Sequence, residues 1–244
     1  MKIKDMATLD LTRYPNELLW LLLLTANFLA ILIAYKSFGK TGLYIWIPIS
    51  TILANIQVLK MVDLFSIGVT LGNITYASSF LATDILSENY QKRDAGKAVL
   101  IGFFSLFSTV IIMHIALAFK PNDADFIQDS FTRIFGLLPR IALGSLIAYG
   151  VAQFHDVWAY DFWKKRFPAA KFIWLRNNAS TMLSQLLDTL IFTTIAFWGM
   201  VETNVFLEIL TTTYLVKWLV AIADTPFIYI AKIMFDRNWI NNDS

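Results

Sequence analysis

Cysteine is absent from this chain, histidine occurs twice, and charged residues make up only 16% of the 244 positions. Without cysteine there are no disulfides, thiolate metal sites or cysteine nucleophiles. His114 and His155 lie far apart in the sequence, which argues against a metal site, and we expect no cofactor. A net charge of +2 is too small to suggest a nucleic-acid partner. No Walker motif is present, so the chain is not expected to hydrolyse ATP itself.

What the sequence has instead is a large excess of apolar residues, which make up 57% of the chain, with 15% aromatic. Ordinary soluble domains carry about 25% charged residues. The composition therefore predicts a polytopic membrane protein. No cleavable signal peptide is expected, because the apolar run Glu17–Tyr35 is long enough to span and lacks a small-residue cleavage site.

Seven apolar runs approach the roughly 20 residues that a membrane-spanning helix needs. The predicted fold is an all-α integral membrane protein, a helical bundle of six core transmembrane helices plus one N-terminal helix. Residues 1–40 would hold the additional helix, 41–236 the six-helix transporter core, and 237–244 a cytoplasmic tail. Part of 60–72 could be non-helical or re-entrant, because it carries two charges and two glycines. The predicted spans are 17–36, 43–60, 66–88, 97–119, 134–157, 178–200 and 205–232.

The connections on one side of these spans carry about twice as many Lys and Arg residues as those on the other. Basic residues are enriched on the cytoplasmic side of membrane proteins. We therefore expect a cytoplasmic C terminus, an outside N terminus, and a location in the cell inner membrane. The longest connection, 158–177, is basic and aromatic, which predicts an interfacial segment on membrane lipid.

Asp188 and Lys217 each stand near the middle of a long apolar run. A charge at that depth costs about 2.5–3.5 kcal/mol on insertion scales. Such residues are kept when they face a protein interior or a water-filled path, usually with a partner. The two could line a path or form a purely structural ion pair between neighbouring helices.

Helical spacing places further polar residues on shared faces with this pair. Such a string of polar groups across the membrane predicts a substrate path or a proton relay. Asp84 and Glu88 could instead be solvated helix ends, because they lie near the end of their span. Apart from this pair of charges, the faces hold Asn55 in the second span, Asn73, Phe80, Asp84 and Glu88 in the third, Arg140 in the fifth, Gln185 in the sixth, and Tyr214 and Asp224 in the seventh.

Three segments carry a resemblance to a known family: Leu53–Lys60, Tyr76–Tyr90 and Ala179–Phe192. Together they resemble the queuosine precursor transporters, once catalogued as vitamin uptake transporters. The resemblance covers about residues 43–235. It implies uptake of a 7-deazaguanine such as preQ0 or preQ1 through a six-helix core.

The residues on the shared faces suit such a base. A carboxylate accepts the adjacent N1–H and 2-amino donors, while an amide or a cation serves the acceptor O6. Aromatic rings stack on the flat face. Lys217 would hold Asp188 ionised when the site is empty. The candidates are Asp188 or Asp84 as the carboxylate, Asn55, Gln185 or Arg140 as its partner, Phe80 or Tyr214 for stacking, and Asp224 or Glu88 for the ammonium of preQ1.

The energy source stays open at this point: protonation of Asp84, Asp188 or Asp224, facilitated diffusion with metabolic trapping, or a separate ATP-driven module. A homo-oligomer is possible. Two other classes compete, namely an intramembrane enzyme acting on a lipid or isoprenoid, and an assembly subunit. The sequence contains no metal-ligand pairing, catalytic dyad or Asp-rich diphosphate motif, which argues against the enzyme.

Overall fold

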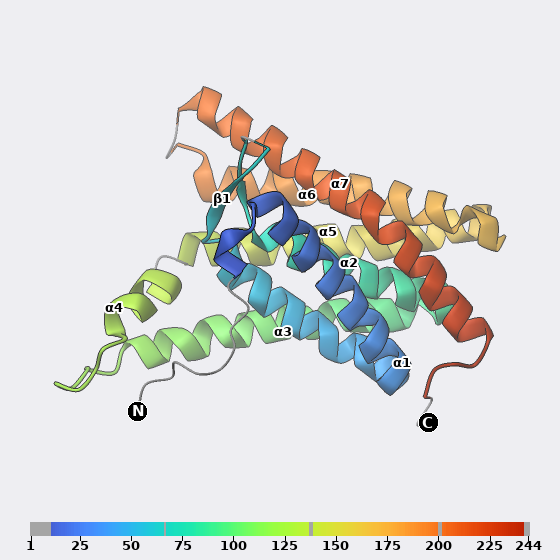
Figure 1. Cartoon of the computed structure of the whole chain (residues 1–244), viewed down its shortest axis with the longest axis horizontal. Helices are drawn as coiled ribbons and strands as arrows, with labels where there is room; N and C mark the ends of the chain where they lie inside the picture. The colour runs from blue at the N-terminus through green and yellow to red at the C-terminus, as the bar shows by residue number, and fades with distance from the viewer. Residues whose placement is uncertain (1–10, 66, 137–138, 200–201, 242–244) are drawn as a thin grey trace.

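The computed structural model describes residues 11–65, 67–136, 139–199 and 202–241, and shows a bundle of long helices with one short β hairpin (Figure 1). Its elements are a 3₁₀ turn Leu11–Arg13, α1 Asn16–Gln57, β1 Met61–Leu64, β2 Ile67–Thr70, α2 Gly72–Asn89, α3 Lys92–Leu117, α4 Gln128–Phe131, a π-helical turn Thr132–Gly136, α5 Pro139–Arg166, a 3₁₀ turn Ala170–Phe172, α6 Ile173–Phe197 and α7 Thr203–Asp236.

Helix α1 is bent back on itself, so that its two arms correspond to the first two predicted spans (Figure 1). The reversal occurs at Gly39, whose φ of 55° and ψ of −138° suit glycine and few other residues. At Gly42 a Cβ atom would lie 2.2 Å from the carbonyl oxygen of Ala34, so only glycine lets the arms approach so closely. Both ends of α1 consequently lie at the same end of the bundle.

The two strands between α1 and α2 are an exception to the all-α prediction. They pair antiparallel, with Met61 opposite Thr70 and Leu64 opposite Ile67. The hairpin is held to the start of α1, because Asn16 Nδ2 donates to the carbonyl of Asp63 at 3.0 Å. Helix α2 begins at Gly72, so the helix start predicted at residue 66 is wrong. β-branched residues, namely Val62, Ile67, Val69 and Thr70, favour extended backbone here.

Helix α2 lies at the centre of the bundle, where α1, α3, α5 and α7 pack around it. All of its residues are buried except Tyr76, which is half-buried. The prediction that Asp84 and Glu88 could be solvated helix ends is therefore wrong: their exposed fractions are 0% and 7%. Protein surrounds this helix on every side, which explains how it can carry so many polar residues.

The bounds predicted for the connection 158–177 are wrong as well. Helix α5 continues to Arg166 and α6 begins at Ile173, so the connection is short. Trp163 stacks on Phe167 with ring centroids 6.0 Å apart, and Nη1 of the fully buried Arg176 donates to the carbonyl of Phe167 at 2.7 Å. Packing between aromatic rings and a buried cation thus holds the turn between α5 and α6 together, while Trp158 and Trp174 are exposed.

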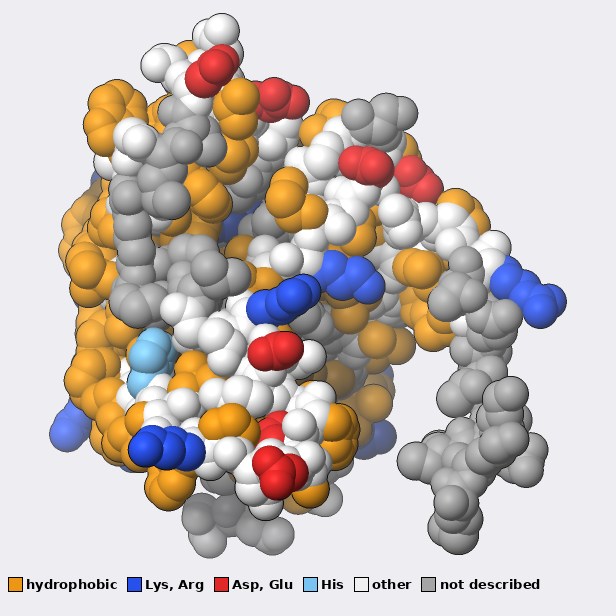
Figure 2. Space-filling model, turned by 90° about the vertical axis from the view of Figure 1, so that its left-hand side faces the viewer, with side chains coloured by type: hydrophobic (Ala, Val, Ile, Leu, Met, Phe, Trp, Pro, Cys, Tyr) orange, Lys and Arg blue, Asp and Glu red, His pale blue; other side chains and the backbone are white. Residues whose placement is uncertain are grey.

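Four segments of the described chain are long and apolar enough to cross a membrane: α1, α3, residues 170–197 and α7. Large apolar side chains such as Ile33, Phe104 and Leu215 are exposed on their outer faces. Figure 2 views the end that holds the β hairpin, where charged side chains are scattered over the middle and a hydrophobic surface runs along the left edge. The structure is thus that of an α-helical membrane protein.

Candidate functional site

A cavity of about 160 Å³ lies near the β hairpin, between α1, α2, α5, α6 and α7. Its walls are mainly apolar and aromatic, with a few polar groups, a composition typical of small-molecule sites. It is lined by Ala54, Asn55, Val58, Leu59, Met61, Gly72, Asn73, Tyr76, Ser145, Tyr149, Asp188, Phe192, Thr193, Phe197, Ile209, Thr213 and Lys217.

Three of these lining residues, Tyr76, Asp188 and Lys217, form what we call the cavity triad. Lys217 Nζ is paired with Asp188 Oδ2, and Tyr76 Oη donates to Asp188 Oδ1 at 2.7 Å. The ammonium also lies 5.2 Å from the centroid of the Tyr76 ring. Asp188 and Lys217 are each 4% exposed, so their charges compensate one another away from bulk water. The triad therefore presents a carboxylate, an ammonium and an aromatic ring to one small cavity.

Deeper in the bundle lies a second group, the aspartate cluster of Asp84, Asp156 and Asp224. All three are fully buried and come from three different helices. Thr181 of α6 donates to Asp84 Oδ2 at 3.1 Å, and Asn177 Nδ2 donates to Asp224 Oδ1 at 2.6 Å. Thr181 precedes Asp188 by seven residues on α6, so the cluster lies about 10 Å from the triad along the helix axis.

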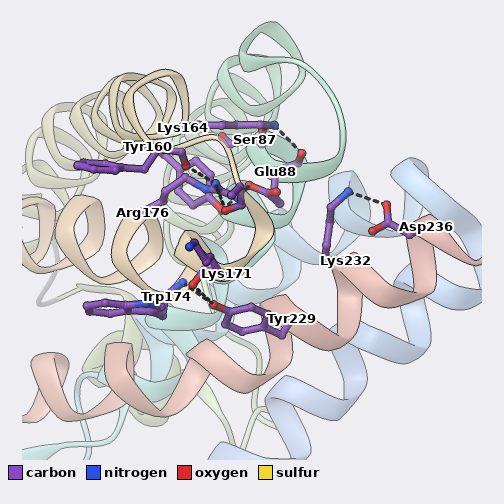
Figure 3. Close-up of polar contacts among 12 residues, drawn as sticks. Ser87, Glu88, Tyr160, Lys164, Lys171, Trp174, Arg176, Tyr229, Lys232 and Asp236 are labelled. Atoms are coloured by element: carbon purple, nitrogen blue, oxygen red, sulfur yellow. Dashed lines mark hydrogen bonds and ion pairs between the residues drawn. The ribbon is translucent and has the colours of Figure 1, made fainter.

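A third group, the inner ion-pair cluster, joins α2, α5 and α6 beyond the aspartate cluster (Figure 3). Arg176 Nη2 lies 2.7 Å from Glu88 Oε2, and Tyr160 Oη donates to the same oxygen at 3.1 Å. Lys164 donates to two carbonyl groups in the last turn of α2, those of Ser87 and Glu88. A cation at these orphan carbonyl groups stabilises the end of the helix. This cluster ties the three helices together at the end opposite the cavity.

The ten predicted site residues separate into groups. Asn55, Asn73, Asp188 and Lys217 line the cavity. Asp84 and Asp224 belong to the aspartate cluster, and Gln185 is fully buried on α6 between the triad and that cluster.

The two aromatic candidates do not line the cavity. Phe80 packs edge-on against Tyr76, with centroids 5.5 Å apart, and so supports the triad from behind. Tyr214 is half-buried, and its hydroxyl faces the carbonyl of Met182 on α6 at 3.5 Å. Arg140 lies in the first turn of α5, and its side chain falls outside the described residues.

Sequence reasoning missed Asp156, Tyr76 and Tyr149. Asp156 precedes the predicted end of the fifth span by one residue, where a carboxylate is ordinarily solvated, but α5 continues for ten residues beyond it. Tyr76 lies in the segment that carries the family resemblance, and its four-residue spacing from Phe80 was the available signal. Tyr149 lines the cavity, and its hydroxyl group packs against Gly102 on α3, where a Cβ atom would lie 2.0 Å away. Among the described residues, no group of three His, Asp or Glu side chains is placed to hold a metal ion.

Comparison with known proteins gives two kinds of match. The family model described as "Putative vitamin uptake transporter" matches residues 70–231. A "Probable queuosine precursor transporter" of Bacillus subtilis (strain 168) is 43% identical over 223 residues, which cover 91% of this chain and 97% of that protein. A protein of the same name from Haemophilus influenzae is 28% identical over 134 residues, covering 55% of this chain and 54% of the relative. No solved structure matches the chain.

Proposed function

The chain belongs to the queuosine precursor transporter family, and on this premise we propose that it imports a 7-deazaguanine precursor of queuosine, such as preQ0 or preQ1, into the cell. A member of this family is a transporter, so the enzyme alternative is set aside. The observation that carries the proposal is the cavity triad, which places a carboxylate, an ammonium and an aromatic ring at one cavity.

The size and lining of the cavity support a flat heterocycle. Its volume of about 160 Å³ is below the roughly 300–1,000 Å³ typical of drug-sized ligands. Tyr76, Tyr149 and Phe192 provide aromatic rings, and such rings stack on the flat face of any nucleobase. These three residues take the stacking role that the sequence assigned to Phe80 or Tyr214.

In the proposed complex Asp188 accepts hydrogen bonds from N1–H and the 2-amino group of the base. Substrate thereby competes with Lys217 and Tyr76, which hold the carboxylate when the site is empty. Asn55 and Asn73 line the cavity and supply amide donors for O6. Gln185 and the carboxylates of Asp84 and Asp224 lie further along the path, and Arg140 keeps its predicted role as a cation at its outer end.

We further propose seven membrane crossings. The first arm of α1 is the additional N-terminal helix, and the second arm with α2, α3, α5, α6 and α7 forms the six-helix core of 41–236. The basic connections around Lys40, Lys92 and Lys164 lie at one end of the bundle, where Lys40 bonds Asp94 and Lys92 pairs with Asp161. That end, with the tail 237–244, faces the cytoplasm of a cell inner membrane, and the cavity faces outward.

Uptake by the purified protein in liposomes tests this function. Labelled preQ0 and preQ1 should enter protein-containing vesicles faster than empty ones, and unlabelled substrate should compete with either. Guanine, which differs in the five-membered ring, serves as the control base. Absence of uptake under every gradient would refute transport by the chain alone, and recovery with a co-reconstituted ATP-driven partner would identify it as a substrate-capture subunit.

A further inference from the structure

The aspartate cluster brings the carboxyl groups of Asp84 and Asp156 together in the fully buried interior. The carboxyl groups of Asp84 and Asp156 lie within hydrogen-bonding reach of each other. An ionised carboxylate only accepts hydrogen bonds, so two of them cannot bond to one another. A carboxyl–carboxylate contact requires one shared proton, as in buried carboxylate pairs where like charges prevent both from ionising. The burial and proximity of the two groups therefore favour at least one bound proton.

Donors around the cluster are too few to stabilise three negative charges. Among the described residues, Asp84 Oδ1, Asp224 Oδ2 and both carboxylate oxygens of Asp156 have no hydrogen-bond donor. Ser180 and Ser184 lie beside Asp156, but their hydroxyl groups donate to the backbone carbonyls of residues 177 and 180. Leaving a buried charged oxygen without a donor is costly, which favours the protonated form.

No cation in the described surroundings is available to neutralise the cluster. Lys217 is paired with Asp188, and Arg176 is paired with Glu88. His155 is only partly buried and contacts the hydroxyl of Ser184 at 2.9 Å. The titratable and charged groups that face the cluster from the helices packed around it are Tyr76 and Glu88 on α2, His155 and Tyr160 on α5, Arg176 and Asp188 on α6, and Lys217 on α7.

The amide of Asn177, which contacts the cluster, also has an unsatisfied hydrogen-bonding atom. Asn177 is fully buried, its Nδ2 donates to Asp224, and its Oδ1 has no partner among the described residues. An amide carries both a donor and an acceptor end. By turning over, Asn177 could donate to an ionised Asp224 or accept from a protonated one. This side chain is therefore suited to a neighbour that gains and loses a proton.

We propose that Asp84 and Asp156, with Asp224 beside them, form the proton-binding site that couples substrate uptake to a proton gradient. The inference rests on the proposed transport function, and it assigns the proton to a site separate from the substrate cavity. Helices α2 and α7 each carry a residue of both sites. On α2 Tyr76 and Asp84 are eight residues apart, or about 12 Å, and on α7 Lys217 and Asp224 are seven residues apart, or about 10 Å. Loading the proton site can thus shift the helices that hold the cavity triad.

The test compares two transport modes in liposomes containing purified protein. A gradient of about one pH unit, acidic outside, should drive up to about tenfold accumulation of preQ0 at one proton per base. Asp156→Asn should lose this accumulation yet keep counterflow, the exchange of labelled for unlabelled base without a gradient. Asp161→Asn is the matched control on the same helix, because Asp161 pairs with Lys165 at a partly exposed position. It should retain both modes.

Infrared spectroscopy tests proton binding without transport. Wild-type protein should show the carbonyl band of a protonated carboxyl group near neutral pH, and Asp156→Asn and Asp84→Asn should each lose intensity. Absence of the band in wild type would overturn the proposal, as would accumulation driven by sodium or unaffected by Asp156→Asn. If Asp156→Asn does not fold, Asp84→Asn replaces it in both assays. Failure of wild type to move either base would refute the proposed transport function, while the infrared result would still decide on the proton site.

Discussion

Replacing Asp188 by Asn should weaken substrate binding by about 10- to 150-fold. The substitution keeps the shape of the side chain but turns one of its two acceptors into a donor, which then faces a donor of the base. A hydrogen bond to a charged group contributes about 1.5–3 kcal/mol, and each 1.4 kcal/mol is a tenfold change in Kd. Equilibrium binding of labelled preQ0 to purified protein measures the change.

The same substitution leaves Lys217 without its partner, and breaking a buried ion pair costs about 3–5 kcal/mol of stability. A double variant, Asp188→Asn with Lys217→Met, removes both charges and should recover the apparent melting temperature in detergent without recovering binding. Glu208→Gln is the matched control, because this carboxylate is exposed on α7. Normal binding by the double variant would refute the reasoning, because the pair would then only hold helices together.

Three further outcomes follow from the packing. Arg176→Met should lower stability by about 3–5 kcal/mol, because Glu88 would stay buried without its cation. Adding Glu88→Gln should restore the melting temperature. A single variant as stable as wild type would contradict this expectation. Gly102→Ala should cost about 1–3 kcal/mol and reduce uptake, because its Cβ would lie 2.0 Å from the Tyr149 hydroxyl; full rescue by Tyr149→Phe would show that this oxygen is the obstacle. Gly39→Ala should destabilise by about 1–3 kcal/mol in thermal unfolding, because its φ is 55°, and an unchanged midpoint would contradict the strain argument.

The contact between Asp188 and Lys217 is predictable because a charge inside an apolar run needs a partner, and each run offers one oppositely charged candidate near its middle. Helical spacing likewise predicts which polar residues share a face on α2, α6 and α7. The burial of Asp156 could not be predicted in this way. A carboxylate near the end of an apolar run looks solvated, and only the continuation of α5 through Trp163 to Arg166 shows that it is buried.

The connections were harder to predict than the spans, for physical reasons. Met61–Thr70 forms a hairpin whose strands satisfy each other's backbone groups, and hydropathy does not distinguish such a hairpin from the start of a weak helix. Residues 158–177 have the composition of an interfacial segment. In the structure the aromatic rings pack on one another, and Arg176 bonds the carbonyl groups of Phe167 and Ala169. Composition indicates the environment of these residues but not where one helix ends and the next begins.

The central position of α2 has a consequence for how the chain is made. It is only 18 residues long and carries Asp84 and Glu88, and one aspartate at the centre of a span costs about 2.5–3.5 kcal/mol when a helix enters lipid alone. The groups that bond these two carboxylates come from α5 and α6, which leave the ribosome later. During synthesis α2 must therefore stay beside the insertion machinery, and nascent chains truncated before α5 should fail to integrate it.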